Sequence, residues 1–254
     1  MVFIDVHCHI DRYSDEEIVE IIGRAKKEGV GIMINNGNTV EADRKNLELA
    51  GMYPQVKAAL GIHPIDYNLY TDEEIKEEIR FIKKNKEKIV AVGEVGFDLK
   101  EAVVDFDRQK KVFFEWMKLA SEIDKPIIIH SRKAEKEAVE IVDEFAKNHK
   151  IKVLMHCFSG NMKLVDKIRD NGWFFSIPAS IKHSTHFQEV VKRVPISQLF
   201  CETDSPFLHP DKERNNEPAL VIEAYKKISE IKGISLNEVE KQIEENYRKF
   251  FNDR

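Results

Sequence analysis

Two histidines separated by one residue near the start of the chain could hold a metal ion. His7 and His9 lie in an apolar stretch that has the composition of a β-strand. Side chains alternate along a strand, so these two imidazoles point to one side, and Val6 and Cys8 point to the other. Two imidazoles on one face can ligate the same divalent cation. An H-x-H pattern alone is a weak signal, and further ligands must come from elsewhere in the chain.

Other ionisable residues recur late in apolar runs of the same kind. Taken singly, each has an ordinary interpretation: His63 could be a turn residue before a proline, His156 a buried histidine bonded to a carbonyl, and Asp204 a helix cap. These ordinary roles do not explain why all of the residues lie at the ends of strands. The ends of parallel strands converge on one face of a barrel, where active sites of that fold lie. The residues concerned are His7, His9, His63, Glu94, His130, His156 and Asp204.

Four histidines and two carboxylates suit a pair of divalent cations bridged by a carboxylate. We expect Glu94 to be the bridge, because it comes from the middle of the strand order. Two cations about 3.5–4 Å apart can activate a water molecule and hold the oxygens of a phosphoryl group during displacement. Asp204 could both bind a metal and accept the proton of the attacking water. The predicted metal ligands are His7, His9, Glu94, His130, His156 and Asp204, with Glu94 and Asp204 also catalytic.

Eight apolar runs, rich in Val, Ile and Phe, have the composition of the buried parallel strands that would carry these residues. They cover residues 3–9, 31–36, 57–63, 89–97, 126–131, 152–159, 173–179 and 199–204. Helical patterns separate most of them, and three helices begin at capping boxes, over residues 14–17, 71–74 and 235–238. Residues 217–252 add two more helices. This alternation over 254 residues predicts an α/β fold, a TIM-type (β/α)8 barrel in a single domain spanning residues 1–254.

Composition narrows the class of protein. The net charge of −5 and the pI near 6.0 argue against a protein that coats long stretches of nucleic acid, but they are compatible with a site that holds one or two phosphates. The three cysteines form no C-x-x-C pair and are expected to be reduced thiols. No apolar run approaches 18 residues, and no signal peptide is recognisable, so we expect a cytoplasmic protein that does not enter the membrane.

The ordered motifs resemble those of the TatD family of metal-dependent deoxyribonucleases, within the amidohydrolase-like TIM-barrel superfamily. The matching segments are DVHCH at 5–9, GIHP at 61–64, GEVGFD at 93–98, IHSR at 129–132, HCFSG at 156–160, ETDSPFL at 202–208, RNNEP at 214–218 and ENYRKFF at 245–251. The resemblance implies that His7, His9, Glu94 and Asp204 hold a first metal, and that Glu94, His130 and His156 hold a second. It also implies 3′ to 5′ exonuclease activity on DNA, supported by Mg²⁺ or Mn²⁺. Zn²⁺ is a third candidate on donor chemistry.

Residues around the predicted barrel mouth are candidates for substrate binding. We assign His63, Arg132 and Arg214 to this role, with DNA chain ends as the partner and only a few phosphates bound. Further basic residues lie on the same loops, namely Lys133, Lys182, His183 and Lys212. Three aromatic residues near these loops, Phe97, Phe158 and Phe207, could stack on a base, but we expect each of them to pack in the core.

Other activities are compatible with this barrel. Relatives that hydrolyse C–N or ester bonds of small metabolites often bridge their metals with a carboxylated lysine at the end of the fourth strand. Here Glu94 occupies that region, and Lys100 lies beyond the strand, which favours phosphoester hydrolysis. Deacylation of D-aminoacyl-tRNA is a third possibility. A binding protein without activity is a fourth, and the complete ligand set argues against it.

Overall fold

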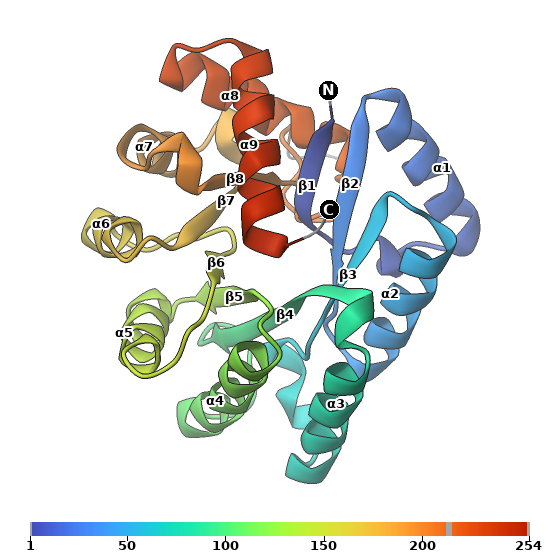
Figure 1. Ribbon diagram of the computed structural model, residues 1–254, viewed down its shortest axis with the longest axis vertical. Coiled ribbons are helices and arrows are strands. Elements are labelled where there is room, and N and C mark those ends of the chain that lie inside the picture. Colours follow the sequence, from blue (N-terminus) through green and yellow to red (C-terminus); the bar gives the residue numbers. More distant parts are fainter. Residues whose placement is uncertain (1, 212–214, 253–254) are drawn as a thin grey trace.

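Eight parallel strands form a nearly closed barrel at the centre of the molecule (Figure 1). The structure is a computed structural model that describes residues 2–211 and 215–252. The strands follow one another around the barrel in chain order. They are β1 (Phe3–Cys8), β2 (Val30–Asn36), β3 (Val56–Leu60), β4 (Ile89–Asp98), β5 (Ile127–Arg132), β6 (Val153–Met155), β7 (Phe174–Pro178) and β8 (Leu199–Glu202). The predicted TIM-type α/β barrel is confirmed.

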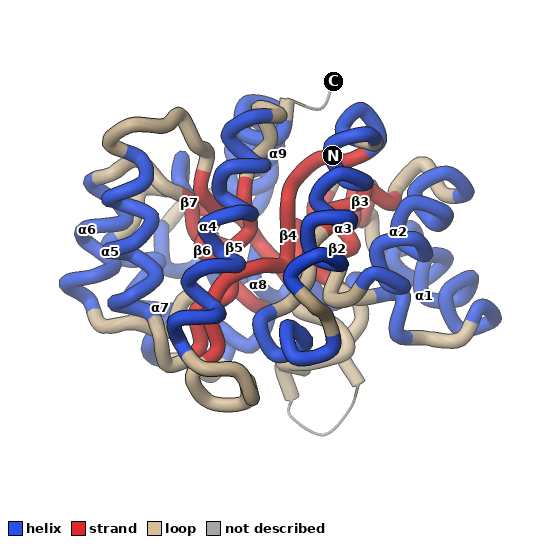
Figure 2. The backbone as a smooth tube through the Cα atoms, turned by 90° about the horizontal axis from the view of Figure 1, so that it is seen from below, coloured by secondary structure: helices blue, strands red, loops and turns tan. Residues whose placement is uncertain are grey.

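Helices surround the strands on the outside of the barrel (Figures 1 and 2). They are α1 (Asp15–Lys27), α2 (Val40–Met52), α3 (Asp72–Lys84), α4 (Phe106–Glu122), α5 (Glu135–Ala146), α6 (Met162–Asp170), α7 (Thr185–Arg193), α8 (Ile222–Lys232) and α9 (Leu236–Phe251). The three predicted capping boxes are present at α1, α3 and α9. In α1 the predicted apolar face, which includes Ile18 and Ile22, is buried against the barrel. Among the described residues, no helix has the length and apolar character needed to cross a bilayer.

The first and last strands are joined at the end of the barrel where the predicted ligands lie. The backbone N–H of Asp204 donates to the carbonyl of His7 at 2.8 Å, and the N–H of His9 donates to the carbonyl of Ser205 at 2.8 Å. Below them, buried Asp5 accepts hydrogen bonds from the backbone N–H groups of His7 and Thr203. These bonds fix the segment after β8 against the segment after β1.

Three strands end two or more residues before the position that the sequence predicts. β3 ends at Leu60 rather than at His63, β6 at Met155 rather than at Ser159, and β8 at Glu202 rather than at Asp204. After these strands the backbone leaves the extended conformation at two positions of the candidate site. Asp204 has φ +55°, and Cys157, next to His156, has φ +42°. Few non-glycine residues adopt such angles, and strained positions of this kind cluster at functional sites.

Candidate metal centre

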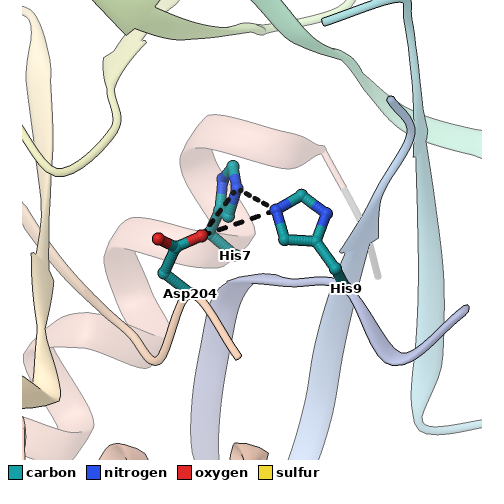
Figure 3. Close-up of side chains that lie close together, drawn as sticks. All are labelled: His7, His9 and Asp204. Carbon is teal, nitrogen blue, oxygen red and sulfur yellow. Dashed lines mark hydrogen bonds and ion pairs between the residues drawn. The ribbon is translucent and has the colours of Figure 1, made fainter. Parts of the chain in front are cut away.

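Three of the predicted ligands meet at the junction of β1 with the segment after β8, as Figure 3 shows. The Nε2 atoms of His7 and His9 lie 3.1 Å apart. Oδ1 of Asp204 lies 3.7 Å from Nε2 of His7 and 3.4 Å from Nε2 of His9. We call these three residues the first cluster. Their donor atoms face one another at distances that would let them share a single cation.

Glu94 also faces His130 and His156, which we call the second cluster. The two clusters are in contact, because the ring of His156 stacks on that of His7 with centroids 3.6 Å apart, and its Nε2 lies 3.8 Å from Asp204 Oδ1. Oε2 of Glu94 faces the first cluster, 3.2 Å from His7 Nε2 and 3.5 Å from His9 Nε2. Its Oε1 faces the second cluster, 2.8 Å from His130 Nδ1 and 3.7 Å from His156 Nε2. The carboxylate therefore offers one oxygen to each group of histidines. All six predicted ligands come together at one end of the barrel.

The imidazole tautomers favour cation binding over a hydrogen-bonded core. Nδ1 of His9 lies 3.0 Å from the carbonyl oxygen of Asn36, which can only accept, so this nitrogen carries the proton. The lone pair of His9 Nε2 then points into the cluster. Another imidazole nitrogen and two carboxylate oxygens lie around it, so lone pairs that could ligate a metal gather at this point. A divalent cation would satisfy this set of donors, so the residues present fit the metal that the sequence predicts.

Two buried carboxylates that the sequence analysis did not select support the second cluster. Oδ2 of Asp98 lies 2.9 Å from His130 Nε2, and Oε2 of Glu202 lies 2.7 Å from His156 Nδ1. Each carboxylate contacts the nitrogen that faces away from Glu94. Such partners fix the ring orientation and raise the basicity of a metal-binding histidine. Glu202 ends an otherwise apolar strand, the same signal that identified Glu94, and could have been found in this way.

The charge balance shows how much positive charge the site attracts. Burial acts to raise the pKa of Glu94, but the surrounding histidines outweigh it and hold this pKa well below its usual value. Burial likewise acts to lower the pKa of His130, yet hydrogen bonds with Asp98 and Glu94 raise it to about 9. The charges of Glu202, Glu94 and Asp204 overcome burial at His156 and raise its pKa to about 10. Without metal, protons on these imidazoles neutralise the carboxylates.

His63 lies at the edge of the second cluster. Its ring centroid is 4.3 Å from that of His130, and its Nε2 is 3.7 Å from Oε1 of Glu94. Its Nδ1 accepts a hydrogen bond from the backbone N–H of Ile65, so Nε2 carries the proton. Burial and the neighbouring His130 lower the pKa of His63 to about 3. His63 is therefore neutral and presents an N–H donor to the centre.

The predicted rim residues have different surroundings. Arg132 ends β5, and its Nη1 lies 2.7 Å from Glu101 Oε1. Arg214, like Lys212, lies outside the described residues. Lys182 is paired with Asp211 at 3.1 Å. Phe97 and Phe158 are buried as expected, but the expectation for Phe207 is wrong, because 48% of it is exposed.

Comparisons with known proteins show the family to which this chain belongs. The family model of TatD-related DNases matches residues 4–252. An uncharacterised metal-dependent hydrolase of Methanocaldococcus jannaschii is 34% identical over 99% of this chain and 98% of its own length. The human deoxyribonuclease TATDN3 is 30% identical over 98% of this chain and 94% of its own length. The crystal structure of YjjV, a TatD homologue from Escherichia coli, superposes with a TM-score of 0.91 at 26% identity, covering 99% of this chain and 98% of YjjV. The chain belongs to the TatD-related DNase family.

Proposed function

We propose that this chain is a metal-dependent phosphodiesterase that acts on DNA, and that it removes nucleotides from chain ends as a 3′ to 5′ exonuclease on single strands. The observation that carries the proposal is Glu94, whose two oxygens face different histidines, Oε2 facing His7 and Oε1 facing His130. The name of the human relative, a deoxyribonuclease, supports DNA as the substrate. Lys100 is half-exposed on the loop after β4 and lies 4.0 Å from Glu101, so it is not placed to serve as a carboxylated bridge.

Six residues would hold two divalent cations, with Mg²⁺, Mn²⁺ and Zn²⁺ as candidates. His7, His9 and Asp204 would bind one, His130 and His156 the other, and Glu94 both. Such a pair of cations would supply Lewis acidity to a phosphoryl group and lower the pKa of a bound water. The donor set, rich in imidazole and carboxylate, suits cations of this kind.

Asp204 is the carboxylate best placed to take a proton from water. Its side chain is 15% exposed, whereas that of Glu94 is 3% exposed. Burial acts to raise the pKa of Asp204, but His156 and His9 outweigh it and lower this pKa. The group is therefore ionised at neutral pH and can act as a general base. His63, neutral and with its Nε2 proton directed at the centre, would donate a hydrogen bond to a phosphate oxygen.

A cationic cavity beside the second cluster supports the binding of a phosphate. It has a volume of about 610 Å³ and lies between the end of β5, the first turn of α5 and the loop after β6. Its walls carry the basic side chains of Lys100, Arg132, Lys133 and Lys136, and the acidic side chains of Glu135 and Glu137. We expect Arg132→Ala to raise KM for DNA and to reduce the salt slope of binding by about 1. An unchanged salt slope would mean that Arg132 is an ordinary solvated surface residue that does not contact a phosphate.

The preference for chain ends follows from charge. With a net charge of −5, the protein has no general excess of cations, so its grip on DNA must come from the few at the barrel mouth. The test is to incubate the metal-loaded protein with labelled linear and circular single-stranded DNA of one sequence. Linear strands should shorten progressively and circles should persist. If circles are degraded as fast as linear strands, the enzyme is an endonuclease and not an exonuclease. If neither substrate is cleaved, the proposed function is wrong.

A further inference from the structure

An exposed aromatic ring borders the candidate metal centre. Phe207 follows Asp204 by three residues, and its ring centroid lies 6.3 Å from that of His9 in an edge-to-face arrangement. About half of Phe207 is exposed, although aromatic side chains of this size are usually buried. An exposed apolar group directly beside a catalytic centre suggests a surface that is covered when substrate binds.

Hydrogen bonds hold the main chain of Phe207 in a fixed position relative to Asp204. The N–H of Phe207 donates to the carbonyl of Asp204 at 2.8 Å. The carbonyl of Phe207 accepts from Nδ2 of Asn216 at 2.8 Å, and the same amide nitrogen donates to the carbonyl of Thr203 at 2.7 Å. Any ligand stacked on Phe207 would therefore have a defined distance from the first cluster.

The charge next to the ring complements a nucleotide. The guanidinium of Arg12 lies over the Phe207 ring, 5.5 Å from its centroid. Among the described residues, no carboxylate lies within ion-pair distance of Arg12, which leaves this charge available to a phosphate. Arg12 is exposed. An aromatic surface and a free cation side by side are the elements by which proteins hold single-stranded nucleic acids.

We infer that Phe207 and Arg12 form a nucleotide subsite, in which a nucleobase stacks on the free surface of Phe207 and Arg12 contacts a phosphate of the same strand. The inference rests on the proposed function and goes further, because it names the parts of the substrate that the protein would contact, a nucleobase and a phosphate. Stacking on an aromatic ring tolerates every base, because each base has a π-face. The subsite should therefore distinguish a nucleotide with a base from one without, and should discriminate little among the four bases.

The test compares two oligonucleotides that differ only in the terminal nucleotide, which is either normal or abasic. Wild-type protein should cleave the normal strand with a kcat/KM about tenfold or more higher. Phe207→Ala should reduce this ratio to near one, and Phe207→Trp should restore it. Phe114→Ala is the matched control, because Phe114 is 40% exposed on α4 and also lies beneath a cation, Lys118, but is on the outer ring.

Binding can be measured with much slower turnover in an Asp204→Asn background. A terminal 2-aminopurine should be quenched on binding, and Phe207→Ala should weaken this quenching while Phe114→Ala should not. Equal cleavage of normal and abasic ends by wild-type protein would overturn the subsite and leave the proposed function standing. A ratio unchanged by Phe207→Ala would overturn it as well. Wild-type protein that cleaves neither strand would overturn the proposed function itself.

Discussion

The two halves of the candidate metal centre are constructed differently. The first cluster faces Glu94 with three donor atoms, two from histidines and one from the carboxylate of Asp204. The second cluster faces Glu94 with the imidazoles of His130 and His156, and both of these are backed by a buried carboxylate. In the first cluster, His9 is backed by a neutral carbonyl, and no described residue offers a hydrogen bond to Nδ1 of His7.

This difference indicates that the two sites gain affinity by separate means. The first would have more ligands, two of them carboxylates when Glu94 is included, so we expect it to bind a cation more tightly. The second depends on its outer carboxylates to orient the rings and increase their basicity. The same carboxylates stabilise protons on His130 and His156, which a cation must displace. We therefore expect the first site to fill before the second.

Removing the bridge should have the largest effect, because it acts on both halves at once. In Glu94→Ala neither cation keeps its full ligand set, and kcat/KM should fall by about 10³-fold or more, equivalent to about 4 kcal/mol of transition-state stabilisation. Elemental analysis and the DNA assay on the same preparation would check this. Near-normal turnover would contradict a shared bridge.

Changing the base should affect the first half more than the second, which Asp204 reaches only through His156 at 3.8 Å. Asp204→Asn keeps an oxygen donor but removes the ionised carboxylate, so kcat should fall by about 10²-fold or more. Thermal denaturation of the metal-free variant would show whether the fold is intact. Full activity in Asp204→Asn would mean that another group takes the proton.

Weakening an outer carboxylate should affect the second half more than the first. Glu202→Gln and Asp98→Asn keep the shape of the side chain but remove its charge. Each should weaken the second metal-binding event by about 10- to 100-fold and leave the first nearly unchanged. Calorimetric titration would separate the two events. Asp143→Asn is a suitable control, since Asp143 pairs with Lys167 on the outer helices. Equal weakening of both events would remove the proposed distinction.

The smallest expected effect is the release of protons when metal binds. With pKa values raised to about 9 for His130 and about 10 for His156, both imidazoles are protonated at pH 7.5 in the metal-free protein. Filling the second site should release about two protons, and its affinity should increase as the pH rises toward these values. Burial and the neighbouring His156 lower the pKa of His7. Burial also acts to lower the pKa of His9, but the hydrogen bond with Asp204 and the charge of Glu94 outweigh burial and raise it. Because only one imidazole of the first site has a raised pKa, this site should release fewer protons than the second. Calorimetry in two buffers of different ionisation enthalpy gives the number of protons released at each site. Equal release at the two sites would contradict the proposed difference between them.

The barrel, and the meeting of the candidate ligands at one end of it, could be predicted from the sequence because both follow from local patterns. Apolar runs alternating with capped helices determine the βα units, and polar residues at strand ends mark one face. The exact ends of β3, β6 and β8 could not be predicted in this way, because left-handed backbone angles such as that of Asp204 are set by contacts between distant segments. The exposure of Phe207 escaped prediction for the same reason, since its position depends on Asn216.

The central claim, two unequal sites that share Glu94, can be tested most directly by anomalous diffraction from crystals grown with one and with two equivalents of Mn²⁺. With two equivalents, we expect two peaks about 3.5–4 Å apart on either side of the Glu94 carboxylate. With one equivalent, the peak should lie between His7, His9 and Asp204. A single peak at saturating metal would contradict the shared bridge, and a first peak between His130 and His156 would contradict the order of filling.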